Sequence, residues 1–398
     1  MKRKAIWVFI LLIGAGWLLP WLIPKHPILE GIRFSQAVYD KNNNLLRLTL
    51  SDDEKYRLKL PLSDISPLVV ESTLLQEDRY FFYHPGINPV SLLRGAWHTY
   101  IARDRRMGGS TLTMQLARVR SHIASRTLLG KFIQIAEAIK LEWFYSKKEI
   151  LEAYLNLAPY GFNIEGIGAA SLIYYNKDAD KLTMAEALAL SVIPQSPARR
   201  LPAQGQGKNY TELTASRKSL FDKWLFLHPH DKESQPSFEL QIDVHTPADL
   251  PFHAPHFVDA ALEANHHENN IMTTLDIRMQ NLLARHAKSY VESKRHIGIN
   301  NVSAMLIDYH TMEVKGVLGS VDFFNNEIQG QVNGTKAKRS PGSAMKPFIY
   351  ALGIDQGIIH PLTMLKDAPS SFGDYNPENF DNEFTGPVKA KDALIRSR

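Results

Sequence analysis

The sequence predicts a multidomain protein with an N-terminal transmembrane helix, a mostly α-helical domain and an α/β domain. Three observations predict this: an uncharged apolar run near the N-terminus, a series of helix-start signals, and a later change to mixed helix and strand patterns. A chain of 398 residues is long enough for two or three domains. The expected parts are an anchor over residues 1–25, an extended connector over 26–65, a helical domain over 66–200, a linker or insertion over 201–270 and an α/β domain over 271–398.

Residues 5–23 form the apolar run. They carry no charge over 19 positions, enough for a helix to cross a hydrocarbon layer of ~30 Å. Lys2, Arg3 and Lys4 precede the run and predict a cytoplasmic N-terminus. A cleaved signal peptide is the alternative, but the run is long and no small-x-small cleavage site follows it. We therefore expect a retained single-pass anchor, with the rest of the chain outside the cytoplasm.

Helix-start signals recur through the helical domain. Ser66 is an expected N-cap with Pro67 at the first helical position. Residues 146–149 and 183–186 are capping boxes, each a Ser or Thr followed three residues later by Glu. Apolar residues over 130–144 recur with the period of a helix. These signals together predict a domain built mainly of helices.

The connector and the linker are expected to differ from this domain. Residues 35–39, 45–50 and 56–60 alternate between apolar and polar side chains and predict strands. In the linker the pattern is weaker, and we expect one helix near residues 211–226.

The last part of the chain has an α/β pattern. Asp276 is an expected cap for a helix that runs through residue 289. Residues 302–307 and 313–318 then predict a β-hairpin, and a helix is expected to begin near Ser343.

Composition excludes several classes of protein. Hydrophobic residues make up 44% of the chain and charged residues 22%, which excludes wholesale disorder. The net charge of +5 suits a surface that faces anionic lipid or phosphate, but it is too small to predict binding to nucleic acid. No cysteine is present, so a disulfide scaffold, a zinc–thiolate site and a cysteine nucleophile are excluded.

Glu77 and Asp78 form a carboxylate pair where a helix is expected to end, and aromatic residues follow them up to His84. Such surroundings can hold one carboxyl group at a raised pKa, which suits proton transfer. A solvated acidic pair is the alternative, and it is favoured by this segment alone. A single His near two carboxylates is read as structural, so no metal ligand is assigned.

Two further segments carry candidate residues. Two glycines precede Ser110 and Gln115 at an expected helix start, and Arg118, Arg126 and Lys131 follow, which is a pattern suited to a diphosphate. A flexible loop before an ordinary basic helix is the alternative. In the third segment Glu152 lies four residues before an Asn on the same helix face, and a solvated face is an equally good interpretation.

In combination the three segments resemble glycosyltransferase family 51, the peptidoglycan polymerase domain of class A penicillin-binding proteins. The resemblance covers residues 66–200 nearly end to end, and residues 35–40 and 188–197 look most like the 1C-type branch. It implies a lysozyme-like helical domain at the periplasmic face of the bacterial inner membrane. The implied partners are lipid II, the growing glycan strand, membrane lipid and cell-wall synthesis proteins, with no nucleic acid.

The resemblance also implies a reaction, the polymerisation of lipid II with release of undecaprenyl diphosphate. Glu77 stands at the position of the family's catalytic base, which deprotonates the acceptor sugar. Gln134 replaces a Glu of the family's Arg-Lys-x-x-Glu segment, which weakens the case for the Mg²⁺ or Mn²⁺ that can assist in the family. The residues implied to bind substrate are Asp78, Ser110, Gln115, Arg118, Arg126, Lys131, Gln134 and Glu152.

A second resemblance lies in the α/β part. Ser343 and Lys346 form a Ser-x-x-Lys segment that resembles the transpeptidase domain of the same proteins, which implies an acylated serine and its activating lysine. Ser397 and Arg398 look like the first two residues of Ser-x-Asn, and Lys-Thr-Gly does not occur in the sequence. We therefore expect an incomplete transpeptidase domain that is inactive through truncation.

This expectation gives a first testable prediction. The 398-residue polypeptide should not be acylated efficiently by a β-lactam, because the strand that supplies the oxyanion hole is missing from it. A fluorescent penicillin followed by gel electrophoresis measures the labelling, and stoichiometric labelling at Ser343 would contradict the prediction. For the whole chain the alternative functions are a non-catalytic remnant that binds peptidoglycan or cell-wall partners, and a lysozyme-like enzyme that cleaves glycan.

Overall fold

The structure of the chain is a computed structural model. Internal contacts divide the chain after Thr335 into a larger unit and a smaller unit that ends at Arg398. The predicted anchor over residues 5–23 lies outside the described residues, and among those described no helix is long and apolar enough to cross a membrane. The described residues are 25–91, 97, 110–124, 127–200, 208–234, 238, 242, 244–374 and 376–398.

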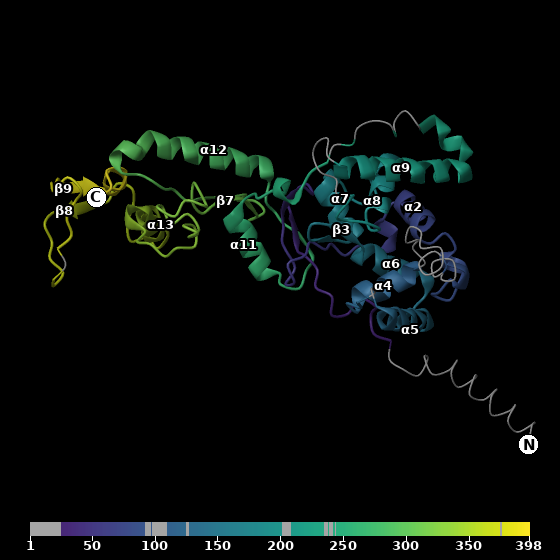
Figure 1. Cartoon of the computed structure of the whole chain (residues 1–398). Coiled ribbons are helices and arrows are strands. Elements are labelled where there is room, and N and C mark those ends of the chain that lie inside the picture. The colour runs from purple at the N-terminus through teal and green to yellow at the C-terminus, as the bar shows by residue number, and fades with distance from the viewer. Residues whose placement is uncertain are drawn as a thin grey trace, which may run out of the picture. The chain divides into compact units, whose positions relative to one another are not determined.

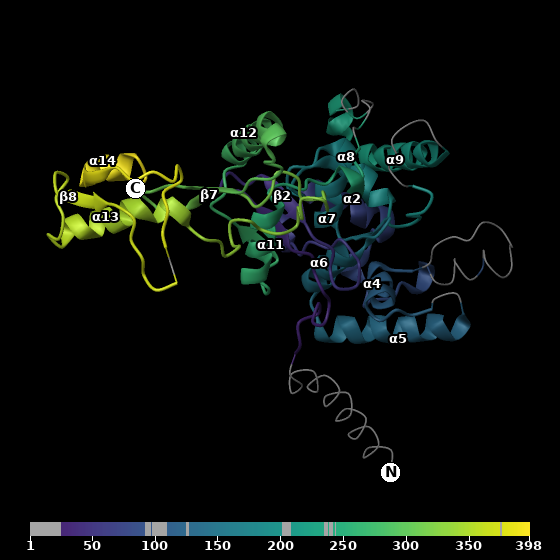
Figure 2. The same cartoon turned by 90° about the vertical axis from the view of Figure 1, so that its left-hand side faces the viewer.

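Helices form most of the larger unit, as the sequence predicts (Figure 1). Helix α2 packs against α8 and α9, while α4 packs against α5 and α6. Both views show α4 beside α5 (Figures 1 and 2). The helices are α2 (Pro67–Glu77), α4 (Leu112–Arg120), α5 (Leu128–Phe144), α6 (Lys147–Leu157), α7 (Ile167–Tyr175), α8 (Met184–Val192) and α9 (Lys208–Leu227).

Local sequence explains where these helices begin. The hydroxyl of Ser66 caps α2 by accepting the amide of Leu68, and Pro67 follows at the first helical position. The capping boxes at residues 146–149 and 183–186 both form, because hydroxyl and carboxylate each accept a backbone N–H of the other residue. Helix α5 begins slightly before the predicted position, and Thr127 caps it.

The connector forms two of the three predicted strands. Strands β1 (Ala37–Tyr39) and β2 (Leu45–Leu48) pair in antiparallel fashion, and β1 pairs in parallel with β5 (Asn270–Met272). The third expected strand, residues 56–60, is wrong. Tyr56 makes one isolated bridge to Ile164. A strand needs a neighbouring strand to pair with along its length, and residues 56–60 have only this one bridge.

The segment predicted to be a linker contributes to the helical core. Helix α9 includes the predicted residues 211–226 and buries Leu220, Phe221 and Trp224, while α9 packs against α2 and α8. A further helix that the sequence did not predict, α11 (Pro255–Ala264), precedes β5. Residues 201–270 are therefore more structured than expected.

The remaining predicted elements are confirmed. Asp276 caps α12 (Ile277–Lys294) by accepting two backbone amides, and β6 (Ala304–Ile307) pairs in antiparallel fashion with β7 (Val314–Leu318). The smaller unit contains the short helix η7 (Gly342–Met345), α13 (Lys346–Asp355), β8 (Met364–Asp367), β9 (Gly386–Lys389) and α14 (Ala390–Ile395).

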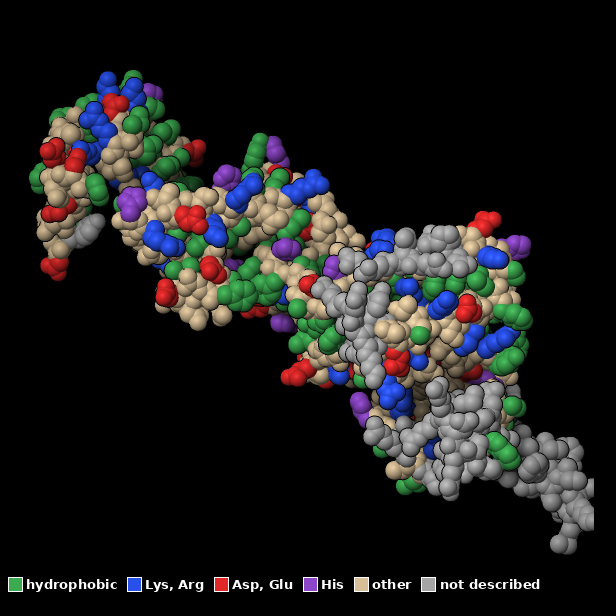
Figure 3. Space-filling model, turned by 45° about the horizontal axis from the view of Figure 1, so that its top comes forward, with side chains coloured by type: hydrophobic (Ala, Val, Ile, Leu, Met, Phe, Trp, Pro, Cys, Tyr) green, Lys and Arg blue, Asp and Glu red, His purple; other side chains and the backbone are tan. Residues whose placement is uncertain are grey.

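Charges of both signs are mixed on the surface. On the face shown in Figure 3, Lys and Arg side chains alternate with Asp and Glu and form no continuous basic stripe. This pattern agrees with the small net charge of +5.

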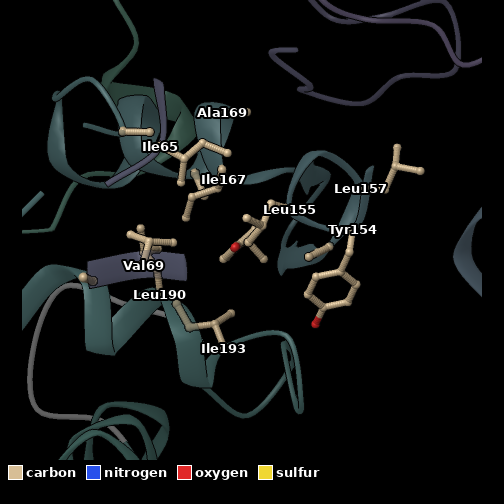
Figure 4. Close-up of a cluster of buried hydrophobic side chains, with 14 of the residues drawn as sticks. Ile65, Val69, Tyr154, Leu155, Leu157, Ile167, Ala169, Leu190 and Ile193 are labelled. Carbon is tan, nitrogen blue, oxygen red and sulfur yellow. The ribbon is translucent and has the colours of Figure 1, made fainter. Parts of the chain in front are cut away.

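Buried aliphatic side chains join the helices. Val69 of α2, Leu155 of α6 and Leu190 of α8 are fully buried and belong to one cluster (Figure 4). Burial of each such side chain contributes about 1.5–3 kcal/mol. Tyr154 lies at the edge of this cluster, and its hydroxyl points away from Leu155. The cluster therefore packs α2, whose last residue is Glu77, against α6 and α8.

Candidate active site

Glu77 is the last residue of α2. Its Oε2 accepts a hydrogen bond from Nε2 of Gln115 on α4 at 2.7 Å, whereas Oε1 is buried and has no hydrogen-bond partner among the described residues. Burial raises the pKa of this carboxyl group, and the Gln115 bond and the charges of Arg200 and Arg118 oppose that effect. A buried carboxyl group with one free oxygen is suited to accept a proton.

Asp78 holds the neighbouring backbone. Both of its carboxylate oxygens lie 3.0 Å from Nε2 of His84, and Oδ2 also accepts the amide of Leu112 at 2.9 Å. Leu112 is the first residue of α4, so Asp78 ties the segment after α2 to the start of that helix. The hydroxyl of Thr111 reinforces this link by donating to the carbonyl of Gly86 at 2.5 Å. These contacts make Asp78 a positioning residue for α4.

A cation lies on the neighbouring helix. Nζ of Lys131 on α5 lies 2.5 Å from Oγ of Ser110 and 3.1 Å from Oε1 of Gln134. Gln134 is itself buried, and its Nε2 donates to the carbonyl of Met114 on α4 at 2.6 Å. Burial lowers the pKa of Lys131, and the positive charge of Arg118 lowers it further. Two cations that act on each other in this way suit a ligand with more than one negative charge.

Two buried tyrosines complete the surroundings of Glu77. Tyr154 lies on α6 and Tyr160 on β3 (Pro159–Gly161). Burial raises the pKa of both phenols, and the negative charge of Glu77 raises it further. The hydroxyl of Tyr154 is buried without a partner among the described residues. Neither tyrosine was predicted, since a Tyr among apolar residues indicates only a core position.

Arg200 is a further charged residue that sequence reasoning missed. Its Nη1 donates to the carbonyl of Val192 at 2.6 Å and to Oε1 of Gln195 at 2.8 Å. Burial lowers the pKa of this guanidinium, and the charges of Glu212 and Glu77 oppose that effect. The sequence signal for Arg200 is an Arg pair one residue after residues 188–197.

Glu152 is bonded to the backbone of the connector and makes no hydrogen bond to Glu77 or Lys131 among the described residues. Its Oε2 accepts the backbone amide of Leu62 at 2.9 Å, and on the same face of α6 Asn156 exchanges hydrogen bonds with the backbone of Leu60. This face of the helix therefore holds the connector. Arg126 and the glycines before Ser110 lie outside the described residues.

A divalent metal does not fit the residues near Lys131. Oε1 of Gln134 already accepts from the Lys131 ammonium, whose charge would repel a metal cation. In the described part of the chain, no group of three or more His, Asp or Glu side chains is placed to hold a metal ion.

The smaller unit contains the second predicted set of residues. Ser343 lies exposed in η7, and Lys346 is the first residue of α13. Nζ of Lys346 donates to the carbonyl of Ser397 and lies 3.3 Å from its Oγ. The unit therefore brings together the lysine of Ser-x-x-Lys and the serine that resembles the start of Ser-x-Asn. A direct interaction between Ser343 and Lys346 stays a prediction.

Comparisons with known proteins agree with both parts. Residues 42–223 match the family model described as transglycosylase, and residues 302–398 match the model described as penicillin binding protein transpeptidase domain. The chain is 35% identical over 378 residues to "Penicillin-binding protein 1C" of Escherichia coli K12, with 95% of this chain and 47% of that protein covered.

Two relatives from Bacillus subtilis 168 extend the comparison. "Penicillin-binding protein 1F" is 27% identical over 377 residues, with 92% of this chain and 52% of that protein covered. "Penicillin-binding protein 2D" is 28% identical over 403 residues, with 94% and 56% covered. The chain thus spans about half the length of these relatives, and the predicted resemblance is confirmed for the helical and the α/β part.

Proposed function

The chain belongs to the class A penicillin-binding proteins, and from this membership we propose that it is a peptidoglycan glycosyltransferase. Its reaction would join lipid II into glycan strands and release undecaprenyl diphosphate. The observation that carries the proposal is a buried carboxyl group, Glu77, with one oxygen that has no hydrogen-bond partner among the described residues, and a pair of cations: Arg118, whose charge acts on Glu77, and Lys131, on which Arg118 acts in turn. The reaction requires a base that takes a proton and cationic groups that bind the diphosphate.

In the proposed reaction a carboxylate takes the proton of the acceptor, and two cations stabilise the leaving group. Oε1 of Glu77 takes the proton from the 4-hydroxyl of the acceptor sugar. The hydroxyl oxygen then forms a bond to the anomeric carbon of the donor, with inversion, while the bond from that carbon to the phosphate oxygen breaks. The diphosphate leaves with the bonding electron pair, and Lys131 and Arg118 stabilise its negative charge.

We propose supporting roles for other predicted residues, and their hydrogen bonds support these roles. Gln115 orients the carboxylate through Oε2 and leaves Oε1 for the substrate. Ser110 and Gln134 hold the Lys131 ammonium in place. Asp78 fixes the start of α4, the helix that carries Gln115.

We also propose that residues 5–23 anchor the chain in the bacterial inner membrane, with the helical domain on the periplasmic side. The uncharged length of the segment and the three basic residues before it support this topology. An enzyme held at the bilayer would meet a substrate that is itself carried on a lipid.

Incubation of the purified protein with lipid II tests the proposed activity. We expect polymeric glycan to appear, together with undecaprenyl diphosphate. Two other results are informative: shortening of preformed glycan would support a lysozyme-like hydrolase, and no change in either substrate would support a non-catalytic remnant. Either one would contradict the proposal.

A further inference from the structure

The hydrogen-bond partners of Arg200 among the described residues are neutral groups. Nη1 bonds the carbonyl of Val192, the last residue of α8, and Oε1 of Gln195 in the segment that follows. Nε is buried without a partner, and among the described residues no carboxylate lies within ion-pairing distance of the guanidinium. Partial burial of a charge costs free energy, and a negative charge nearby offsets part of that cost.

Hydrogen bonds connect Arg200 to the end of α2. Oε1 of Gln195 also accepts from Nε2 of Gln76 at 3.3 Å, and Gln76 immediately precedes Glu77. Oε1 of Gln76 accepts in turn from Nζ of Lys223 on α9 at 3.4 Å. The segment after α8, the end of α2 and helix α9 therefore meet beside Glu77.

We propose that Arg200 is a positioning residue for Glu77: its fixed positive charge keeps the buried carboxylate in the ionised form that can accept a proton. The inference rests on the proposed function of Glu77 as the base. Gln115 and Arg118 act on the carboxylate from α4, whereas Arg200 acts from the segment after α8. The carboxylate therefore has favourable partners on two different elements.

Other charged and titratable groups act on the same pair. Glu212 on α9 is the second carboxylate whose charge acts on Arg200, so it is the alternative partner that a test must separate from Glu77. Among the described residues, the other charged groups that act on Glu77 are Asp78 and Arg118, and the charge of Glu77 in turn acts on Tyr154 and Tyr160.

The pH dependence of lipid II polymerisation tests the inference. Loss of a nearby positive charge favours the protonated carboxyl group, so Arg200→Gln should move the acidic limb of the rate profile to higher pH by about 0.5–1 unit. Arg200→Lys should restore most of the wild-type profile. Arg199→Gln removes the same charge from the exposed neighbouring residue and should leave the profile unchanged. If Arg200 has only a structural role, Arg200→Gln should lower the stability of the protein without moving the acidic limb of the rate profile.

A double-mutant cycle tests the same pairing without any activity. The cycle is measured over a range of pH, and at its alkaline end Arg200→Gln should reduce the free energy of unfolding more in the wild type than in the Glu77→Gln background. Equal losses in both backgrounds, a larger coupling with Glu212 than with Glu77, or an unmoved acidic limb in an active enzyme would each overturn the inference. A wild-type protein that forms no polymer would refute the proposed function, while the cycle would still report on Arg200.

Discussion

Glu77→Gln should reduce lipid II polymerisation by about 10²- to 10⁴-fold, because an amide cannot take the proton of the acceptor hydroxyl. The substitution preserves size, and its amide oxygen can still accept the hydrogen bond from Gln115. Initial rates of polymer formation measure the effect. A rate within a few fold of the wild type would remove Glu77 from the chemistry and favour a non-catalytic remnant.

The stability of the Glu77→Gln variant separates loss of chemistry from loss of fold. Burial raises the pKa of Glu77, so ionisation of this group disfavours the folded state once the pH exceeds the pKa of the unfolded chain. Stability is therefore lost as the pH rises and the carboxyl group ionises. A neutral amide avoids this cost, so at neutral pH the melting temperature of the variant should equal or exceed that of the wild type.

The pH profile gives a second measurement on the same variant. In the wild type, activity should fall as the pH drops through the raised pKa of Glu77, at a higher pH than is usual for a glutamate. The residual activity of Glu77→Gln should lack this limb. Glu71→Gln is the matched control, since Glu71 lies on the same helix and is bonded to His228 on the surface. It should retain the activity and the limb of the wild type.

Sequence reasoning predicted the features that short segments determine. The Ser66 cap and the capping boxes depend on residues within one helical turn, and each formed as predicted. Residues 56–60 have the alternation of a strand, but strand formation depends on a partner, and Tyr56 found only Ile164. Local pattern therefore served helices better than isolated strands.

The candidate site divides in the same way. Glu77 and Lys131 lie in short segments that, taken singly, also fit a solvated acidic pair and an ordinary basic helix, so only the combined resemblance predicted a base and an anion-binding group. In the structure the charge of Arg118 acts on both residues. Sequence analysis assigned no chemical role to Arg200 or to Tyr154, although Tyr154 lies in the same segment as Glu152. Their relation to Glu77 arises only from the packing of α2 on α8 and of α4 on α6, which no local pattern encodes. Glu152 shows the opposite case, a charged residue on a suggestive helix face that holds the backbone of Leu62.

Lys131→Met should lower polymerisation by about 10²- to 10³-fold, through loss of the positive charge that stabilises the departing diphosphate. The ammonium is held by Ser110 and Gln134, so its charge is fixed before the substrate binds and needs no reorganisation during the reaction. Most of the loss should fall on kcat, because negative charge on the leaving oxygen grows in the transition state. Steady-state kinetics with lipid II separate kcat from KM.

Lys140→Met is the control, because it removes the same charge from the same helix but at a position outside the proposed site. Lys140 lies on the same helix, is largely exposed and is 3.5 Å from Glu137, so its removal should leave kcat unchanged. Lys131→Arg should recover only part of the activity, because a planar guanidinium cannot occupy the ammonium position between Ser110 and Gln134 with the same geometry.

Since burial depresses the pKa of Lys131, the wild type should also lose activity on the alkaline side at a lower pH than is usual for a lysine. Equal kcat in Lys131→Met and Lys140→Met would mean that the leaving group departs without help from this cation, and the diphosphate site would then have to lie elsewhere.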